Sequence, residues 1–250
     1  MATDSRFHLD SPPVKRVALT VNFQAEPRLQ GWHLDEFFRE AAGRYLSREE
    51  VAPRPDSAFE FLAASGAWPI PKTQFASNER SLSIQGDELE VAWNFGDEGE
   101  KAYPGFDSLM EELESVITHL VTSVRKHDVE ITTQEVECFY INEIDGMSAA
   151  DYAVGVLTDW ADVTPRSLPE EGYVGVRLHA CGDTEEHQCS SLVMVDSSDE
   201  DGSPILSLRV GRPLGDDDSA EEAMRQAHDE LITLFRAYTP DWLRAQWGES

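Results

Sequence analysis

A broad apolar stripe marks residues 106–126 as the longest predicted helix. The apolar residues recur at steps of three and four, which places them on one side of a helix of about 20 residues. The stripe consists of Phe106, Leu109, Met110, Leu113, Val116, Ile117, Leu120, Val121 and Val124. Segments 34–46 and 220–238 repeat this spacing. The pattern therefore predicts three amphipathic helices, each with one face directed at a core.

Alternation of apolar and polar residues predicts the strands, because successive side chains of a strand point to opposite faces. The alternating or strand-like segments are 17–23, 81–85, 88–95, 138–144, 173–181, 190–196 and 204–210. Gly86-Asp87 separates the second and third segments and predicts a hairpin turn.

Shorter elements follow from local signals. Residues 47–50 have the spacing of a helix capping box and predict a short helical turn. The Pro-rich segment 52–72 is expected to be an ordered loop, and Ser148 is expected to begin a short helix. Thr239-Pro240 predicts a terminal helix. Its expected packing anchors are Trp242, Leu243 and Trp247.

These elements predict an α+β protein with mainly antiparallel sheet packed against two or three long helices. The helices are expected to cover one sheet face or to be gripped by curved sheets. Both halves of the chain place strands before a long helix, which suggests two similar α+β lobes, 1–145 and 146–250. A single domain is the alternative, since 250 residues allow either arrangement.

The charge narrows the choice of partners. The chain has 20 Lys and Arg against 48 Asp and Glu, a net charge of −28. Such a field repels nucleic-acid phosphates and anionic membranes, which argues against non-specific binding to either. Three explanations remain open: solubility, docking on a basic protein partner, or imitation of DNA.

The setting is expected to be the cytoplasm. Three cysteines in 250 residues do not form a disulfide scaffold. The first residues lack a basic region followed by an apolar run, so no secretory signal is expected. No window approaches 18 uninterrupted apolar residues, so no membrane span is expected either.

Several short motifs occur in a characteristic order. They are strand 81–85, strand 89–94 with Trp93-Asn94, Tyr103, Tyr140–Ile144, Ala227-His228, Phe235 and Trp247-Gly248. In this order the chain resembles a family of sporadically distributed, conserved hypothetical bacterial proteins of about 250 residues. The resemblance implies an accessory gene cluster, phage defence included. It carries over no activity and no catalytic residue.

The sharpest candidate for chemistry is a metal site. His179 and Cys181 are separated by five residues from His187 and Cys189. On a hairpin, each His–Cys pair shares one strand face, and two His with two Cys can close a tetrahedral zinc site. The spacing differs from common zinc fingers, so a plain solvent-facing hairpin is the alternative.

A second candidate lies at the end of strand 138–144. Tyr140, Asn142 and Glu143 put polar groups where a strand end can line a ligand pocket. Alternatively, Asn142 satisfies backbone groups in the turn at Asp145-Gly146.

No catalytic residues are predicted. The sequence has no Gly-Lys-Ser/Thr phosphate loop, Gly-x-Gly-x-x-Gly, Gly-x-Ser-x-Gly or His-Glu-x-x-His motif. The leading hypothesis is a non-enzymatic interaction protein, such as a regulatory or sensing subunit of an accessory or defence system. The alternatives are a small-molecule-binding protein or enzyme with a pocket between sheet and helices, and a DNA-mimic inhibitor. A homo-oligomer is compatible with each.

Overall fold

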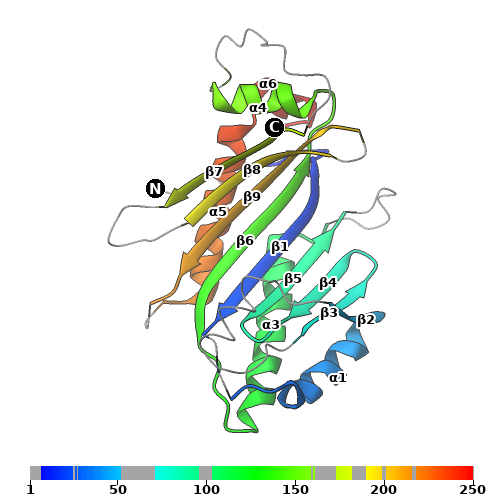
Figure 1. The fold of residues 1–250 in the computed structure, drawn as a ribbon, viewed down its shortest axis with the longest axis vertical. Helices are drawn as coiled ribbons and strands as arrows, with labels where there is room; N and C mark the ends of the chain where they lie inside the picture. The colour runs from blue at the N-terminus through cyan, green and yellow to red at the C-terminus, as the bar shows by residue number, and fades with distance from the viewer. Residues whose placement is uncertain are drawn as a thin grey trace. The chain divides into compact units, whose positions relative to one another are not determined.

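The computed structural model describes residues 7–24, 26, 28–51, 71–95, 103–158, 160, 173–181, 190–198, 201–215 and 218–249. These residues form a mixed fold with a large antiparallel sheet and several helices (Figure 1). The predicted α+β class with mainly antiparallel sheet is therefore confirmed.

The strands are β1 (Val14–Phe23), β2 (Ser47–Val51), β3 (Lys72–Ser77), β4 (Arg80–Ile84), β5 (Glu88–Asn94), β6 (Thr133–Glu143), β7 (Gly175–Cys181), β8 (Ser190–Ser197) and β9 (Pro204–Pro213). The helices are η1 (Gly31–Leu34, a short 3₁₀ helix), α1 (Asp35–Arg44), α3 (Phe106–Arg125), α4 (Ala149–Leu157), α5 (Ala220–Tyr238) and α6 (Asp241–Gln246).

The described strands follow the order β2-β3-β4-β5-β1-β6-β9-β8-β7 in the sheet. The pairs β2–β3, β3–β4, β4–β5, β1–β5 and β7–β8 are antiparallel. In this order β2 and β7 are the edge strands. Between β3 and β4, Asn78 takes a left-handed conformation (φ 45°), and the tight turn sets Ser77 opposite Arg80.

The strongest sequence patterns give the elements they predict. Helix α3 covers the apolar stripe of 106–126, and α5 has the bounds of the predicted helix 220–238. The β4–β5 hairpin turns at Gly86-Asp87, with Ile84 paired to Leu89. Ser148 caps α4, because its hydroxyl accepts the Asp151 amide at 3.1 Å.

The prediction of a helical turn at residues 47–50 is wrong. These residues belong to β2, which pairs with β3 from Ser47↔Ala76 to Val51↔Lys72. The alternative hydrogen-bond partners come from β3, whose paired residues lie 21 to 29 positions farther along the chain. A local capping signal is worth about 1 kcal/mol, and a complete strand ladder outweighs it.

The predicted terminal helix is present as α6. Of its predicted packing anchors, Leu243 is buried and Trp242 is not. Leu243 is fully buried, whereas Trp242 is about half exposed at 49%. Trp242 packs edge-on against Trp160, with 6.0 Å between ring centroids. Most of the predicted loop 52–72 lies outside the described residues, since only positions 71 and 72 are described.

Two compact units are formed from interleaved segments. The α3 unit comprises Arg16–Cys138 and Gly211–Ala227, and the α4 unit comprises Met1–Lys15, Phe139–Val210 and His228–Ser250. A boundary at residue 145 between consecutive lobes stays a prediction.

In the α3 unit, α3 packs on β5 and α1 packs on α3. The buried core of this unit includes Leu19, Phe37, Phe75, Leu82, Val91, Leu109, Leu113, Val116 and Leu120. In the α4 unit, α4 packs on β8. Its buried core includes Tyr152, Leu192, Val195, Leu206, Leu208, Leu231 and Leu243. Among the helices that the structure describes, none has the length and apolar character that crossing a bilayer requires.

Candidate functional site

The predicted ligand-binding residues Tyr140, Asn142 and Glu143 do not converge. They lie on β6, where burial alternates along the strand. Tyr140 and Asn142 share the buried face, while Glu143 points to the other face. The structure therefore brings two of the three residues together.

Their observed contacts hold strands in place. The Asn142 side-chain amide donates to the Leu206 carbonyl at 3.1 Å, and no described group donates to its buried Oδ1. Glu143 forms an ion pair with Lys15 (3.1 Å) and accepts a bond from the Ser203 hydroxyl (3.3 Å). The predicted contact of Asn142 with the turn at Asp145-Gly146 is replaced by this contact with β9. Ligand binding by these residues stays a prediction.

The predicted zinc site lies only partly within the described residues. His179 and Cys181 are on β7, opposite Leu192 and Ser190 of β8. His187 and Cys189 lie outside the described residues. In the described part of the chain, no three His, Cys, Asp or Glu side chains could hold a metal ion together. The zinc site stays a prediction, as does the solvent-facing hairpin.

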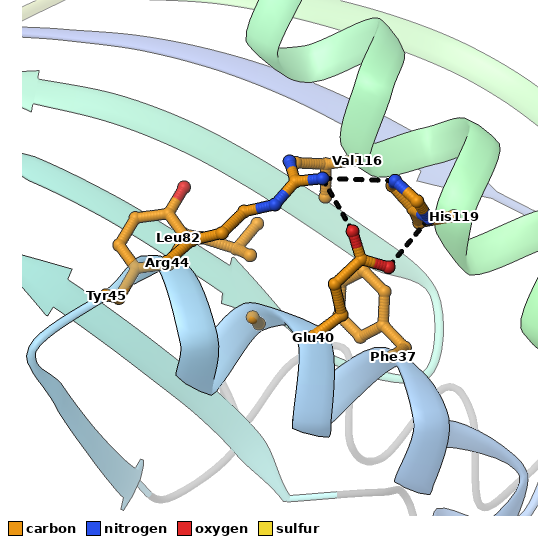
Figure 2. A pocket seen from close by; sticks show the side chains of 8 residues that line it. Phe37, Glu40, Arg44, Tyr45, Leu82, Val116 and His119 are labelled. Atoms are coloured by element: carbon orange, nitrogen blue, oxygen red, sulfur yellow. Dashed lines mark hydrogen bonds and ion pairs between the residues drawn. The ribbon is translucent and has the colours of Figure 1, made fainter.

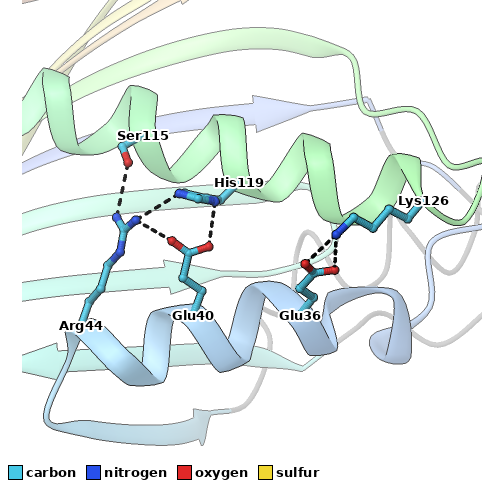
Figure 3. A network of polar contacts seen from close by, with 6 residues as sticks. All are labelled: Glu36, Glu40, Arg44, Ser115, His119 and Lys126. Atoms are coloured by element: carbon cyan, nitrogen blue, oxygen red, sulfur yellow. Dashed lines mark hydrogen bonds and ion pairs between the residues drawn. The ribbon is translucent and has the colours of Figure 1, made fainter.

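A polar network that the sequence patterns did not reveal joins α1 to α3 (Figure 3). Arg44 is its centre. Its guanidinium donates to Glu40 (2.6 Å) and Ser115 (3.3 Å) and lies 3.1 Å from Nε2 of His119. Nδ1 of His119 lies 2.7 Å from the second oxygen of Glu40. Each helix supplies two residues spaced four apart, so both pairs lie on one helix face.

These partners assign the proton of His119. The Glu40 carboxylate only accepts hydrogen bonds, so Nδ1 of His119 carries the hydrogen. Arg44 only donates, so Nε2 of His119 is the acceptor, and a neutral ring satisfies both neighbours. A general base would need this lone pair directed at a substrate. Although Ser115, His119 and Glu40 match the residue types of a hydrolytic triad, here they join two helices.

A second ion pair joins the same helices at the other end of α1. Nζ of Lys126 lies 2.6 Å from both carboxylate oxygens of Glu36 (Figure 3). The hydrogen bond from Lys126, followed by its charge, lowers the pKa of Glu36. Both groups are solvent-exposed, so the pair sets the position of α1 more than it stabilises the fold.

Three residues of the Arg44 network, Glu40, Arg44 and His119, also line a small pocket (Figure 2). Its floor is formed by Phe37, Ala41, Leu82 and Val116, from α1, β4 and α3. It encloses about 10 Å³, far below the roughly 300 Å³ at which sites for drug-sized ligands begin. That is room for about one water molecule.

A polar groove of about 360 Å³ lies beside this pocket in the α3 unit. It is lined by Arg44, Tyr45, Ser77, Arg80, Ser108, Glu111, Glu112 and Ser115. Glu112 is already paired, because it accepts the Tyr45 hydroxyl at 2.7 Å and lies 3.0 Å from Arg80. Burial, and then the Glu112 carboxylate, raise the pKa of Tyr45, so its hydroxyl stays a donor.

The groove has one carboxylate left for an incoming group. Arg44 is balanced by Glu40, and Arg80 by Glu112. Glu111 is exposed on α3, and none of the described groups forms an ion pair or hydrogen bond with it. The groove therefore presents paired charges, hydroxyl groups and a single available anion.

Two histidine rings, those of His33 and His127, stack on each other in the same unit. Nδ1 of His33 accepts the Gln30 amide at 3.0 Å, and the ring stacks on His127 with 5.0 Å between centroids. Trp32 packs against both rings, at 3.7 and 4.9 Å. Since a backbone amide only donates, the observed contact requires His33 to be neutral at Nδ1.

Acidification is expected to destabilise the α3 unit through His33. Burial, and then the neighbouring His127, lower the pKa of His33 below its ordinary value of 6.5. The unfolded chain therefore binds this proton first. The contribution of His33 to the free energy of unfolding is therefore fully present above about pH 6.5. It decreases as the pH falls from there toward the pKa of His33 in the folded state. Urea midpoints between pH 7.5 and 5 should decrease, and His33→Gln should flatten this slope. An unchanged slope in His33→Gln would contradict the assignment.

Comparison with known proteins gives no relative on which to base a function. No family model matches the chain, and no curated protein matches it. Among solved structures, the chain is similar to the di-domain ARO/CYC StfQ from the steffimycin biosynthetic pathway, at 10% identity. That match covers 93% of this chain and 97% of the other, with a TM-score of 0.26. So loose a superposition carries no argument about fold or function.

Proposed function

We propose that this protein is an acidic, non-enzymatic interaction protein that binds a basic segment of a partner protein in the polar groove. The observation that carries the proposal is Glu111, an exposed carboxylate beside two arginines that are already neutralised. A Lys or Arg side chain entering the groove could form an ion pair with Glu111, the charged residue of the groove lining that has no described counter-ion. The net charge of −28 would attract such a partner from a distance.

The rest of the groove suits a cationic side chain. Ser77, Ser108 and Ser115 supply hydroxyl oxygens that can accept hydrogen bonds from an ammonium or guanidinium group. Leu46 follows Tyr45 directly and is 81% exposed. An exposed large apolar side chain beside a polar groove is a common composition of a protein-binding surface.

The proposal includes the setting inferred from the sequence. The resemblance to sporadically distributed bacterial proteins supports a regulatory or sensing subunit of an accessory or phage-defence system in the cytoplasm. Long helices α3 and α5 each follow a set of strands, which supports two lobes built on one plan. The proposed setting and the proposed two-lobe plan do not depend on binding at the groove.

A small-molecule-binding protein is the second candidate. It is favoured by the apolar pocket between α1, α3 and β4, which lies between helices and sheet as that hypothesis requires. At about 10 Å³ the pocket has room for about one water molecule, so a ligand would enter it only if the lining side chains moved apart.

Native mass spectrometry of protein purified from its own cells at low salt tests the proposal. Glu111→Lys is expected to reduce the retained fraction of a basic protein partner at least tenfold, because it places like charges in the groove. Glu130→Lys is the matched control, since Glu130 is also exposed in the α3 unit but does not line the groove. Equal loss in both variants would show general charge attraction. A chain that retains a small molecule and no protein would favour the second candidate.

A further inference from the structure

Strand β2 ends the sheet beside the groove. It is the first strand in the sheet order, and β3 is the neighbour with which it pairs in the described residues. Four of its five residues are exposed. Leu46 directly precedes β2. Its amide donates to the carbonyl of Ala76 and to the hydroxyl of Ser77, each at 2.9 Å. Because Ser77 lines the groove, β2 begins at the groove wall.

The side chains of β2 divide between its two faces. Arg48 stacks on Phe38 (4.5 Å to the ring centroid) and approaches Phe75 (5.8 Å), so it points to the α1 side. Glu50, two residues on, shares that side and forms an ion pair with Arg48 at 3.3 Å. Glu49 points to the opposite side. Both faces of the edge therefore carry a carboxylate.

We propose that the edge of β2 accepts an extended, basic segment of the partner protein as an additional strand. This inference rests on the proposed function and specifies how the partner binds. Every second N–H and C=O group of an edge strand points away from its neighbour, and an added strand satisfies these groups. Glu49 and Glu50 would face the alternating side chains of the added strand, and cross-strand pairs of opposite charge are favourable. The same segment would reach Glu111 in the groove.

A second copy of this chain is the less suitable occupant. The register of an antiparallel pair of two β2 strands decides which side chains meet. Centring on Glu50, or between Glu49 and Glu50, sets carboxylates opposite each other, which is destabilising, whereas centring between Arg48 and Glu49 sets these opposite charges together. Two chains of net charge −28 also repel each other before contact. The net charge of the chain therefore favours a basic strand over a second copy at this edge.

The test uses the full-length protein and a capped Lys/Thr peptide of Lys-Lys-Thr-Thr repeats, which as a strand presents lysines on both faces. The peptide of Glu-Glu-Thr-Thr repeats is the negative control. Amide hydrogen exchange measured by NMR is expected to show at least tenfold slowing at alternate residues of β2 when the Lys/Thr peptide is bound. The double variant Glu49→Lys/Glu50→Lys is expected to weaken peptide binding at least tenfold. Glu130 is exposed and lies outside β2, so Glu130→Lys is expected to change peptide binding less than twofold.

The other outcomes separate this inference from the proposed function. Peptide binding that depends on Glu111 but leaves β2 exchange unchanged would overturn the strand addition and keep the groove as the docking site. Failure of the peptide to bind at all would overturn both. Slowing of β2 exchange that rises with protein concentration in the absence of peptide would show self-pairing and overturn the basic partner.

Discussion

Arg244→Ala is expected to lower the free energy of unfolding of the α4 unit by about 3 to 5 kcal/mol. Arg244 is 6% exposed. Its guanidinium donates to the carbonyls of Arg236 (2.8 Å) and Thr239. It also pairs with Glu249 (2.8 Å) and with Asp241. Alanine would leave these acceptors without their donor in a part-buried site. Urea denaturation, with hydrogen exchange of α5 and α6 amides, measures the loss.

Arg225→Ala is the matched control for this prediction. Arg225 also joins two carboxylates, Asp107 at 2.6 Å and Glu221 at 3.2 Å, but its side chain is 43% exposed. An exposed pair of this kind contributes at most about 1 kcal/mol, because water screens it and mobile side chains must be ordered. Equal losses in Arg225→Ala and Arg244→Ala would show that burial of the guanidinium is not what stabilises this end of the chain.

Phe75→Ala is expected to lower the free energy of unfolding of the α3 unit by about 3 to 5 kcal/mol, the usual range for a large aromatic side chain in a core. Phe75 is fully buried, 5.9 Å from Phe38 and 6.2 Å from Tyr45 between ring centroids. The cavity would loosen the packing of α1 on β3. Tyr45 and Arg48 would lose a neighbour, so binding at the groove and at β2 should weaken together.

Two controls accompany Phe75→Ala. Phe75→Leu keeps most of the volume and should cost well under half as much. Leu46→Ala removes an apolar side chain that is 81% exposed, and it should change stability by no more than about 0.5 kcal/mol. A small loss in Phe75→Ala would mean that the site collapses around the cavity and that α1 is held mainly by its polar contacts with α3.

The alternation within β6 already contained information about the predicted ligand site. Residues 140 and 142 share a strand face, and residue 143 cannot join them. The predicted site therefore spans both faces of the strand, and ligand binding by its residues stays a prediction. The groove could not be predicted from alternation within one strand, because its lining comes from α1, the β3–β4 turn and α3. Four-residue spacing on two helices was the available signal for Glu40–Arg44 and Ser115–His119, but it does not show that the two helices meet.

The elements whose pattern is local, α3, α5 and the β4–β5 hairpin, could be predicted from the sequence. Their periods of 3.6 and 2 residues arise from backbone geometry within one segment. Tertiary contacts were needed to show that residues 47–51 form a strand at the end of the described sheet, and that Arg44 meets His119, 75 positions away. These contacts depend on which segments pair and on how helices pack, and short polar segments carry no period that specifies either. The position of Glu111 in a groove and that of β2 at the end of the described sheet are therefore visible only in the folded α3 unit.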